Sequence, residues 1–470
     1  MGMPSDYPAS QDTGVTFASL VGATAPPSDT IVCIESGDGD VDVRRLPQML
    51  RKAGHTPDEK VASFLGTAEI TTLEFVHLQV VKTSASTIDS DTLCNFVTTT
   101  CSNLSLRAEC SGDANGEAFG GRSQPKTQSQ KPVHYDSDLH VNDADAGYQE
   151  HLKWMRMGEV WRLALPHVKR KITVAVTDSG IDWKDPDFAL LKGKLKKQSG
   201  GYLEGGWNFV TNSPILTNKD SHGTKVCKIL AAKGNNSFGI AGMAPNVTLV
   251  PLQVFGDTPG ETLSRYVEAL DLAIDVKVDM LSMSVGWELS DLEHAQRNVL
   301  MRALYAVHRS GIFMVSSAGN QFSEVHDMYP CCFGGPTSMC VAYMYSNRTH
   351  NVLNPITNWG IRVDVAAYGN NIFTGRDEKG ELRYFNGTSA AQPLVAGLIA
   401  ILLSMDVDPR MAKSMVMANV DHVDCALPED LPQSIRGGAI NPLRTIKYAI
   451  EWLSSRSRGL RAAKRVGLLD

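Results

Sequence analysis

The chain has 470 residues, of which 43% are hydrophobic, and its 45 Lys and Arg against 51 Asp and Glu give a formal net charge of −6. This length and apolar content are sufficient for a large core and favour two or three domains. The mild negative charge gives no support to a nucleic-acid or anionic-membrane partner. The longest apolar run, residues 394–405, is well short of the ~20 residues of a membrane-spanning helix, so no such helix is expected.

Changes in composition divide the chain into five segments. Residues 1–28 are rich in Ser, Asp, Pro and Thr and are expected to be disordered. Residues 29–110 show short strand and helix patterns typical of a small α+β domain, and the Gly-, Ser-, Gln- and Asp-rich residues 111–145 are expected to be a linker. Residues 146–452 form the main domain, and residues 453–470 a basic tail that is expected to fray.

The small domain is expected to alternate strands and helices. The patterns predict, in chain order, a strand at 30–34, a helix at 46–53, a β-rich run at 72–81, a helix at 91–97 and a strand at 104–108.

The main domain contains apolar runs that alternate with helical patterns. Amphipathic helices are predicted at 263–274 and 292–307. Continuous apolar strands separated by helices predict a parallel β-sheet sandwiched by helices, with a functional site at the carboxyl ends of the strands. The expected strands are 172–176, 247–252, 280–285, 312–315 and 339–344.

Three polar segments stand where this sheet would present a site. Asp178 ends the first apolar strand, His222 begins a helix in Ser-His-Gly-Thr, and Ser389 precedes the apolar helix that contains 394–405. An Asp that orients a His, a His that acts as general base and a Ser at a helix N-terminus could form a catalytic triad. Each also has a structural alternative: a turn cap, a surface histidine and a helix N-cap.

In this order, Asp178-Ser-Gly, His222-Gly-Thr and Gly-Thr-Ser389-Ala resemble the subtilisin family of serine peptidases, over about residues 148–450. The resemblance implies a subtilisin-like α/β domain preceded by a small α+β, ferredoxin-like propeptide domain. It also implies an endopeptidase in which Ser389 attacks the peptide bond, His222 accepts its proton and Asp178 orients His222, with an acyl-enzyme intermediate.

The same resemblance assigns the remaining site residues. Asn320, in Ser-Ser-Ala-Gly-Asn, takes the role of the oxyanion-hole amide. Met328 is expected at the floor of the S1 pocket, where it would favour small or medium apolar P1 residues, although the neighbouring Asp327 leaves a basic preference open. A substrate strand would pair between two strands of the enzyme. The implied substrate-binding residues are Leu252, Val254, Gly256, Ser284, Val285, Gly286, Ala318, Gly319 and Met328. Ala390 and Gln392 depart from the family's usual pattern after the nucleophile and are expected to tune the pocket.

Two segments resemble the family's structural calcium site. Asp185-Pro-Asp-Phe resembles the segment whose second Asp binds Ca²⁺, and residues 234–240 resemble the loop that adds an Asn side chain and carbonyls. A solvated Asp and an ordinary polar loop are the alternative. The implied ligands are Asp187, Asn236, Gly234, Phe238 and Ile240.

By analogy with the family, residues 29–110 are a propeptide that assists folding, inhibits the enzyme and leaves its C-terminal end in the substrate cleft. The processing cut would lie in residues 111–145. The expected partners are protein or peptide substrates and the chain's own propeptide, and the enzyme is expected to be a monomer. Two other functions remain open: a catalytically silent binding module and a peptide ligase or macrocyclase.

The nine cysteines bear on the compartment. No C-x-x-C pair exists, so a zinc site is disfavoured. Four cysteines precede residue 111 and could form two disulfides or remain buried thiols. Cys331, Cys332 and Cys340 cluster and could bridge locally or to Cys425. A secreted or secretory-pathway location is expected, although the N-terminus contains no clear signal peptide.

Overall fold

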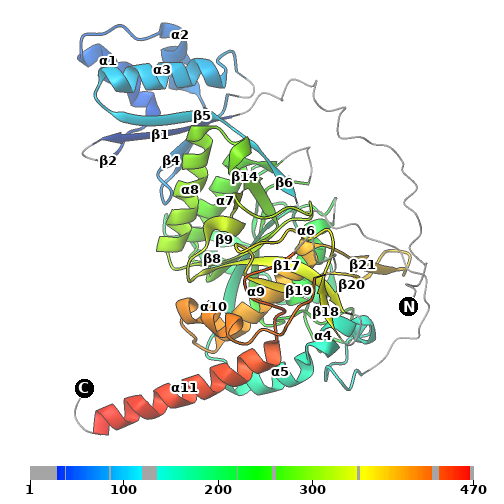
Figure 1. The fold of residues 1–470 in the computed structure, drawn as a ribbon. Coiled ribbons are helices and arrows are strands. Elements are labelled where there is room, and N and C mark those ends of the chain that lie inside the picture. The colour runs from blue at the N-terminus through cyan, green and yellow to red at the C-terminus, as the bar shows by residue number, and fades with distance from the viewer. Residues whose placement is uncertain are drawn as a thin grey trace.

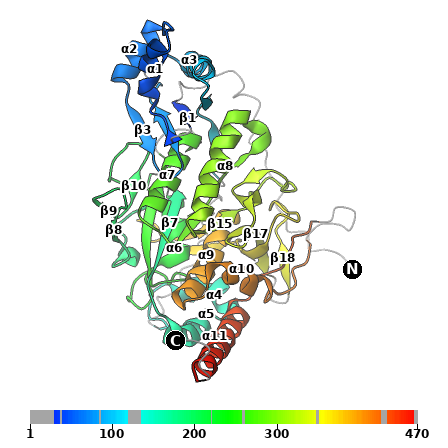
Figure 2. The same cartoon turned by 90° about the vertical axis from the view of Figure 1, so that its left-hand side faces the viewer.

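The computed structural model describes residues 29–36, 39–83, 86–118, 135–219, 221–256, 261–346, 350–425 and 433–465. The expected disordered segment 1–28 and linker residues 119–134 lie outside these ranges. The described chain forms a small N-terminal domain seated on one end of a larger domain (Figures 1 and 2).

The larger domain is built on one sheet with the strand order β10-β11-β7-β13-β15-β17-β18, and β19 also pairs with β17. All paired neighbours are parallel except β17 and β18, which confirms the predicted parallel sheet. The chain enters at β7, adds β11 on one side and later β13 on the other, which makes the ends of β7 and β13 a topological switch point. The bounds are β7 Ile172–Asp178, β10 Trp207–Asn208, β11 Val247–Gln253, β13 Met280–Met283, β15 Phe313–Ser317, β17 Ser338–Ser346, β18 Asn351–Leu353 and β19 Val365–Tyr368.

Helices cover both faces of this sheet because its strands are apolar on both sides. Residues such as Val174 face a core shared with helices α6 and α9, whereas the adjacent Ala175 faces a second core shared with α7 and α8. Helix α9 is buried along almost its whole length, in keeping with its apolar sequence. The bounds are α6 His222–Ala231, α7 Leu263–Asp275, α8 His294–Arg309 and α9 Thr388–Ser404.

Four further helices and two hairpins also belong to the larger domain. Helix α11 continues to Arg465, so it includes much of the segment that the sequence analysis assigned to a frayed basic tail. Among the described residues, no helix combines the length and apolar character needed to cross a membrane. The elements are α4 Glu150–Trp154, α5 Met157–Ala164, β8 Lys194–Lys196, β9 Tyr202–Glu204, β20 Ile372–Arg376, β21 Leu382–Phe385, α10 Pro409–Met417 and α11 Pro442–Arg465.

The N-terminal domain is an antiparallel sheet, ordered β2-β1-β4-β3 with β5 on the other edge of β1, and three helices. Alternation along β1 sends Val32 towards those helices and Ile31 towards α7 and α8 of the larger domain. The domain therefore docks through the helix-free face of its sheet. The bounds are β1 Thr30–Ser36, β2 Gly39–Asp40, α1 Leu46–Lys52, α2 Glu59–Thr67, β3 Ile70–Leu73, β4 Leu78–Val81, α3 Ser90–Asn103 and β5 Arg107–Gly112.

The region predicted as a linker contains a strand. After β5 the chain forms β6 (Asn115–Ala118), which lies between β12 (Glu261–Thr262) and β14 (Val285–Glu288) and is antiparallel to both. Main-chain hydrogen bonds hold such an added strand, so it needs no apolar side-chain pattern. For this reason the composition alone indicated a linker.

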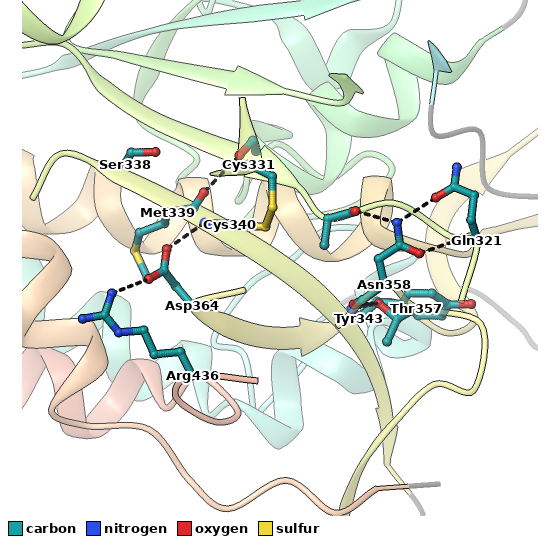
Figure 3. The surroundings of a disulfide bond; sticks show 12 residues. Gln321, Cys331, Ser338, Met339, Cys340, Tyr343, Thr357, Asn358, Asp364 and Arg436 are labelled. Atoms are coloured by element: carbon teal, nitrogen blue, oxygen red, sulfur yellow. Dashed lines mark hydrogen bonds and ion pairs between the residues drawn. A yellow bond between two sulfur atoms is a disulfide. The ribbon is translucent and has the colours of Figure 1, made fainter. Parts of the chain in front are cut away.

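Two disulfides form in the described chain. Cys94 in α3 bonds to Cys110 in β5, and Cys331 bonds to Cys340 in β17 (Figure 3). Cys33 and Cys101 are buried thiols, and burial raises the pKa of each to about 11. The four cysteines before residue 111 therefore combine the two predicted alternatives: one pair forms a disulfide, and the other two remain buried thiols. The Cys331 cluster bridges locally.

A buried ion pair fixes α10 to the far part of the sheet. The Nζ of Lys413 lies 2.8 Å from Oδ1 of Asp364 and donates to the carbonyl of Ser338 at 2.6 Å. The other oxygen of Asp364 accepts the backbone N–H of Cys340 at 3.0 Å, and Arg436 reaches Asp364 from the surface at 3.7 Å (Figure 3). Lys413 and Asp364 are both buried, so each depends on the other for charge compensation.

We expect Lys413→Met to lower the free energy of unfolding by about 3–5 kcal/mol, because it leaves a buried carboxylate without its cation. The matched control Arg436→Ala removes an exposed charge from the same carboxylate and should cost less than about 1 kcal/mol. Urea denaturation of both variants, in a Ser389→Ala background, measures the difference. Equal losses in the two variants would contradict this account of the pair.

Candidate active site

Asp178 and His222 meet at the switch point of the sheet. Asp178 is the last residue of β7, and His222 is the first residue of α6. The Nδ1 of His222 lies 2.7 Å from Oδ1 of Asp178, and both side chains are buried. The same Oδ1 accepts the backbone N–H of Ser179 at 2.7 Å, which fixes the carboxylate. This bond leaves Nε2 as the nitrogen of His222 that can take up a proton.

Gly223 permits this close approach. A Cβ on Gly223 would lie 2.3 Å from the carbonyl oxygen of Gly180 and 3.0 Å from Oδ1 of Asp178, so any side chain would separate α6 from β7. The backbone N–H of Gly223 also donates to the hydroxyl of Ser179 at 3.0 Å.

Two aromatic rings surround the imidazole of His222. Phe385, at the end of β21, meets it edge-on with ring centroids 5.2 Å apart, and Phe255 lies 6.0 Å away. Such apolar neighbours exclude water and strengthen the Asp178–His222 bond. The sequence analysis did not identify either ring, because neither phenylalanine belongs to a motif that marks a catalytic residue.

Ser389 and Asn320 lie together at the start of α9. Ser389 is the second residue of α9 and is fully buried. The Oδ1 of Asn320 accepts the backbone N–H of Thr388 at 3.0 Å and its hydroxyl at 3.2 Å. Gly387 has φ = +107°, a backbone conformation that favours glycine, and a Cβ there would lie 3.2 Å from the Asn320 amide. The amide oxygen is thus held by Thr388, and the Nδ2 of Asn320 is the group that can donate to an oxyanion.

Helix packing brings Ser389 and His222 to the same rim. Helices α6 and α9 pack against each other on one face of the sheet. Phe385, four residues before Ser389, contacts the ring of His222. The elements that carry the four predicted residues therefore meet at one rim, formed by the carboxyl ends of β7 and β15 and the first turns of α6 and α9.

Asn358 holds the loop that carries Asn320. Its Nδ2 donates to the carbonyl of Ala318 at 2.9 Å and to Oε1 of Gln321 at 2.8 Å (Figure 3). Its Oδ1 accepts the backbone N–H groups of Gln321 and Ser323, at 2.9 and 3.0 Å. Asn358 is buried, and the sequence analysis missed it because no motif surrounds it.

Gln392, the unusual residue after the candidate nucleophile, is buried below the site and does not line it. Its Oε1 accepts the hydroxyl of Ser282 in β13, and its Nε2 donates to the carbonyl of Val315 in β15, both at 3.0 Å. The amide therefore anchors the first turns of α9 to two strands of the sheet.

The predicted substrate strand 284–286 lies at the edge of β14 that β6 covers. Val285 and Gly286 pair with Ala118 and Glu117 of β6. Ser284 directly precedes β14, and Ala318 and Gly319 lead into Asn320. A substrate strand could use the same edge of β14 that β6 uses.

The prediction that Leu252, Val254 and Gly256 form the opposing strand is wrong. Leu252 lies inside the main sheet, paired on both sides, and Val254 donates its N–H to the carbonyl of Asp178 at 2.9 Å. Gly256 packs against Ser179, from which its Cβ would be 2.8 Å away. The strand that flanks β6 on that side is β12, which carries no apolar run that a sequence pattern could reveal.

Met328 is buried in β16 (Met328–Tyr329), paired with Glu288 of β14. Asp327 turns to the segment after β14, where its Oδ2 accepts the N–H of Ser290 at 3.0 Å. The acidic side chain is therefore committed to that turn, which favours the apolar reading of this pocket.

The groups around Asp187 do not fit a calcium ion, which takes six to eight oxygen ligands. Oδ1 of Asp187 faces Nδ2 of Asn236 at 3.3 Å, and Oδ2 accepts the N–H of Ile240 at 3.1 Å and lies 3.2 Å from Nζ of Lys228. Oδ1 of Asn236 accepts the N–H of Phe238 at 2.9 Å. Among the residues that the structure describes, no cluster of three or more His, Cys, Asp or Glu could hold a metal.

The remaining implied ligands, Gly234, Phe238 and Ile240, belong to a loop that closes directly on Asp187. A Cβ on Gly239 would lie 2.1 Å from Oδ2 of Asp187, so the backbone itself covers the carboxylate. Burial raises the pKa of Asp187 to about 6, and Lys228 acts in the opposite direction. Its environment is thus made of N–H groups and one ammonium.

Cys227 is another potential nucleophile near the site. It is fully buried in α6, and burial together with the negative charge of Asp178 raises the pKa of its thiol well above the ordinary value. A protonated, buried thiol is a poor nucleophile. Ser389 is therefore the better candidate.

Comparison with known proteins supplies a family. Residues 169–430 match the sequence profile of the Subtilase family. The chain is similar to a thermophilic serine proteinase of Bacillus sp. (strain AK1), with 32% identity over 234 residues, 49% of this chain and 52% of that protein. It is similar to thermitase of Thermoactinomyces vulgaris, with 28% identity over 231 residues, 49% of this chain and 74% of that protein. The matched part spans about half the length of the Bacillus protein.

Solved structures show the same fold. Fervidolysin from Fervidobacterium pennivorans, a keratinolytic enzyme, has a TM-score of 0.61 at 18% identity, over 89% of this chain and 61% of that chain. The epidermin leader peptide processing serine protease of Staphylococcus aureus has a TM-score of 0.59 at 14% identity, over 90% of this chain and 99% of that chain. At these identities the likeness concerns the fold alone.

We expect Asn358→Leu to release the loop that carries Asn320, because it removes four hydrogen bonds from a buried amide. The backbone amides of Gln321 and Ser323 should then exchange with solvent deuterium at least about tenfold faster. The matched control is Gln433→Leu, since Gln433 is also buried and bonds the carbonyls of Asn354 and Thr357 on the same segment. Unchanged exchange in Asn358→Leu, or equal acceleration in the control, would contradict the assigned role.

Proposed function

The chain belongs to the subtilase family, and we propose that it is a serine endopeptidase with Asp178, His222 and Ser389 as its triad. The observation that carries the proposal is the buried 2.7 Å contact between Asp178 and His222, at the rim where Ser389 begins α9. Asn320 is the proposed side-chain donor to the oxyanion. Its position against Thr388, the neighbour of Ser389, supports this role.

The proposed reaction has two halves. Ser389 Oγ attacks the scissile carbonyl carbon while its proton passes to Nε2 of His222, and Asp178 stabilises the resulting imidazolium. The carbonyl oxygen becomes an oxyanion that accepts hydrogen bonds from Nδ2 of Asn320 and the backbone N–H of Ser389. His222 then gives the proton to the leaving amine, which leaves an acyl-enzyme. A water molecule, deprotonated by His222, hydrolyses the acyl-enzyme and restores Ser389.

The N-terminal domain is the proposed propeptide. Strand β6 continues directly from the sheet of this domain and pairs with Val285 and Gly286 of β14, in the manner proposed for a substrate. Because β6 is antiparallel to β14, its last residue, Ala118, lies opposite Val285, the residue that follows Ser284. We therefore propose that this segment inhibits the enzyme and that the processing cut follows Ala118 closely.

Protein or peptide substrates follow from the proposed reaction, with the N-terminal domain as an intramolecular inhibitor of a monomeric enzyme. A secreted or secretory-pathway location is also proposed. The two disulfides, Cys94–Cys110 and Cys331–Cys340, support it, because such bonds persist in oxidising compartments.

Expression of the full chain should yield a shortened enzyme whose new N-terminus lies within residues 119–123, whereas Ser389→Ala should yield an uncut chain. N-terminal sequencing and mass spectrometry of both products measure this. The control Ser404→Ala alters a serine at the opposite end of α9 and should be processed normally.

An organophosphonate should also label Ser389 in the processed protein and should not label it in Asp178→Asn. A properly folded wild-type chain with neither cleavage nor adduct would overturn the proposal and favour a silent binding module. Peptide products that carry an added amine instead of water would favour a ligase.

Release of the N-terminal domain should depend on pH. Burial in the docked state raises the pKa of Glu268 from 4.5 to about 7, and that of Asp271 from 3.8 to about 6. Asp271 accepts the N–H groups of Phe75 and Val76 from the N-terminal domain, and Lys82 of that domain faces Glu268. The N–H groups of Phe75 and Val76 and the charge of Lys82 lower these pKa values, but burial outweighs them in the docked structure and favours the protonated carboxyls. We therefore expect docking to be strongest at low pH and to weaken as the pH rises to about 7.

After processing, the fraction of enzyme that retains its N-terminal domain should fall severalfold between pH 5 and pH 8, as measured by size-exclusion chromatography at each pH. Glu268→Gln is neutral at every pH and should flatten this dependence. A retained fraction that rises with pH, or an unchanged profile in Glu268→Gln, would contradict the assignment.

A further inference from the structure

A buried lysine lies beside the segments that resemble a calcium site. Lys228 lies in the last turn of α6, with only 8% of its side chain exposed. Its Nζ is 2.8 Å from Oδ2 of Asp185 and 3.2 Å from Oδ2 of Asp187. One ammonium therefore bridges two carboxylates, of which Asp187 is the residue that the family resemblance assigns to calcium.

The space around this ammonium is closed. Gly375, in β20, has φ = +112°, and a Cβ there would lie 3.0 Å from Nζ of Lys228. The absence of a side chain at Gly375 thus lets the β20–β21 hairpin cover the lysine. A lysine ammonium is a compact charge with three N–H donors, and the C-terminal turn of a helix favours a positive charge.

The hydrogen bonds of the loop also suit an ammonium partner better than a metal ion. Both oxygens of Asp187 face N–H groups, from Asn236 and Ile240, and the Asn236 carbonyl oxygen accepts the N–H of Phe238. The carboxylate of Asp143, also buried, accepts the N–H groups of Asn235 and Asn236, at 2.8 and 3.3 Å. In a calcium site these oxygens would point at the ion.

We infer that the ammonium of Lys228 takes the place of a calcium ion and holds the loop 234–240 to the rest of the domain. The ion pair with Asp185 and Asp187 is internal to the chain. The loop therefore keeps its structure without a dissociable cation, and the protein is insensitive to chelators at this point. The inference does not depend on the proposed peptidase activity.

The test uses the full-length chain with Ser389→Ala, so that self-cleavage cannot mimic unfolding. Its melting temperature, followed by circular dichroism, should differ by less than about 2 °C between millimolar CaCl₂ and millimolar EDTA, because a ligand that does not bind the folded state does not stabilise it. Lys228→Met, which keeps the apolar stem and removes the ammonium, should lower the melting temperature by about 6–20 °C in both solutions.

The matched control is Lys233→Met, which removes the same charge two residues beyond the end of α6 and should shift the melting temperature by less than about 2 °C. The inference is overturned if Lys228→Met melts with the control. It is also overturned if calcium raises the melting temperature of the parent chain and Asn236→Ala abolishes that rise. If calcium still raises the melting temperature of Asn236→Ala, the ion binds elsewhere in the chain, and the melting temperature of Lys228→Met then decides the inference. Should Lys228→Met fail to fold, the calcium and EDTA comparison on the parent chain still decides.

Discussion

The short contact between Asp178 and His222 joins two residues that lie 44 positions apart in the sequence, and the site depends on that contact. It forms because β7 and its neighbours are parallel, so their carboxyl ends reach one rim, where α6 and α9 begin. Gly223 and Gly387 remove the side chains that would force these helix starts away from the strand ends. Burial then gives a single polar contact more strength than it would have in water.

The N-terminal domain contacts the larger domain through both its sheet and strand β6. The parallel sheet is assembled from contacts that are distant in sequence, which makes folding slow. The N-terminal sheet packs on α7 and α8, the two helices that cover one whole face. Strand β6 then completes the edge of β14 with main-chain bonds. The N-terminal domain thus packs against a domain whose sheet depends on contacts distant in sequence, and it covers the proposed cleft.

The sequence could predict those parts in which a local pattern carries a chemical requirement. The apolar runs predicted β7, β11, β13, β15 and β17, and the glycine-flanked motifs predicted Asp178, His222, Ser389 and Asn320. Asn358 and Gln392 were not predicted as supports, because their partners become neighbours only in the folded sheet. Strand β6 has no apolar periodicity, and β12 is only two residues long, so neither produces a strand pattern in the sequence. The resemblance therefore assigned the strand opposite 284–286 to the buried residues 252–256. The motif around Asp187 matches the family's calcium segment, but Lys228, the cation that pairs with Asp187, lies outside that motif.

The Cys331–Cys340 bond has a consequence for how the proposed substrate cleft would select side chains. It links the segment that follows Met328 and Tyr329 to β17, a strand of the main sheet (Figure 3). One wall beside β14 is therefore covalently fastened to the same framework that holds Asn320. In the proposed endopeptidase, a substrate side chain too large for that wall would not push it outward, so the cleft would discriminate by excluding side chains that do not fit. Broader specificity would require changing the residues that line the wall.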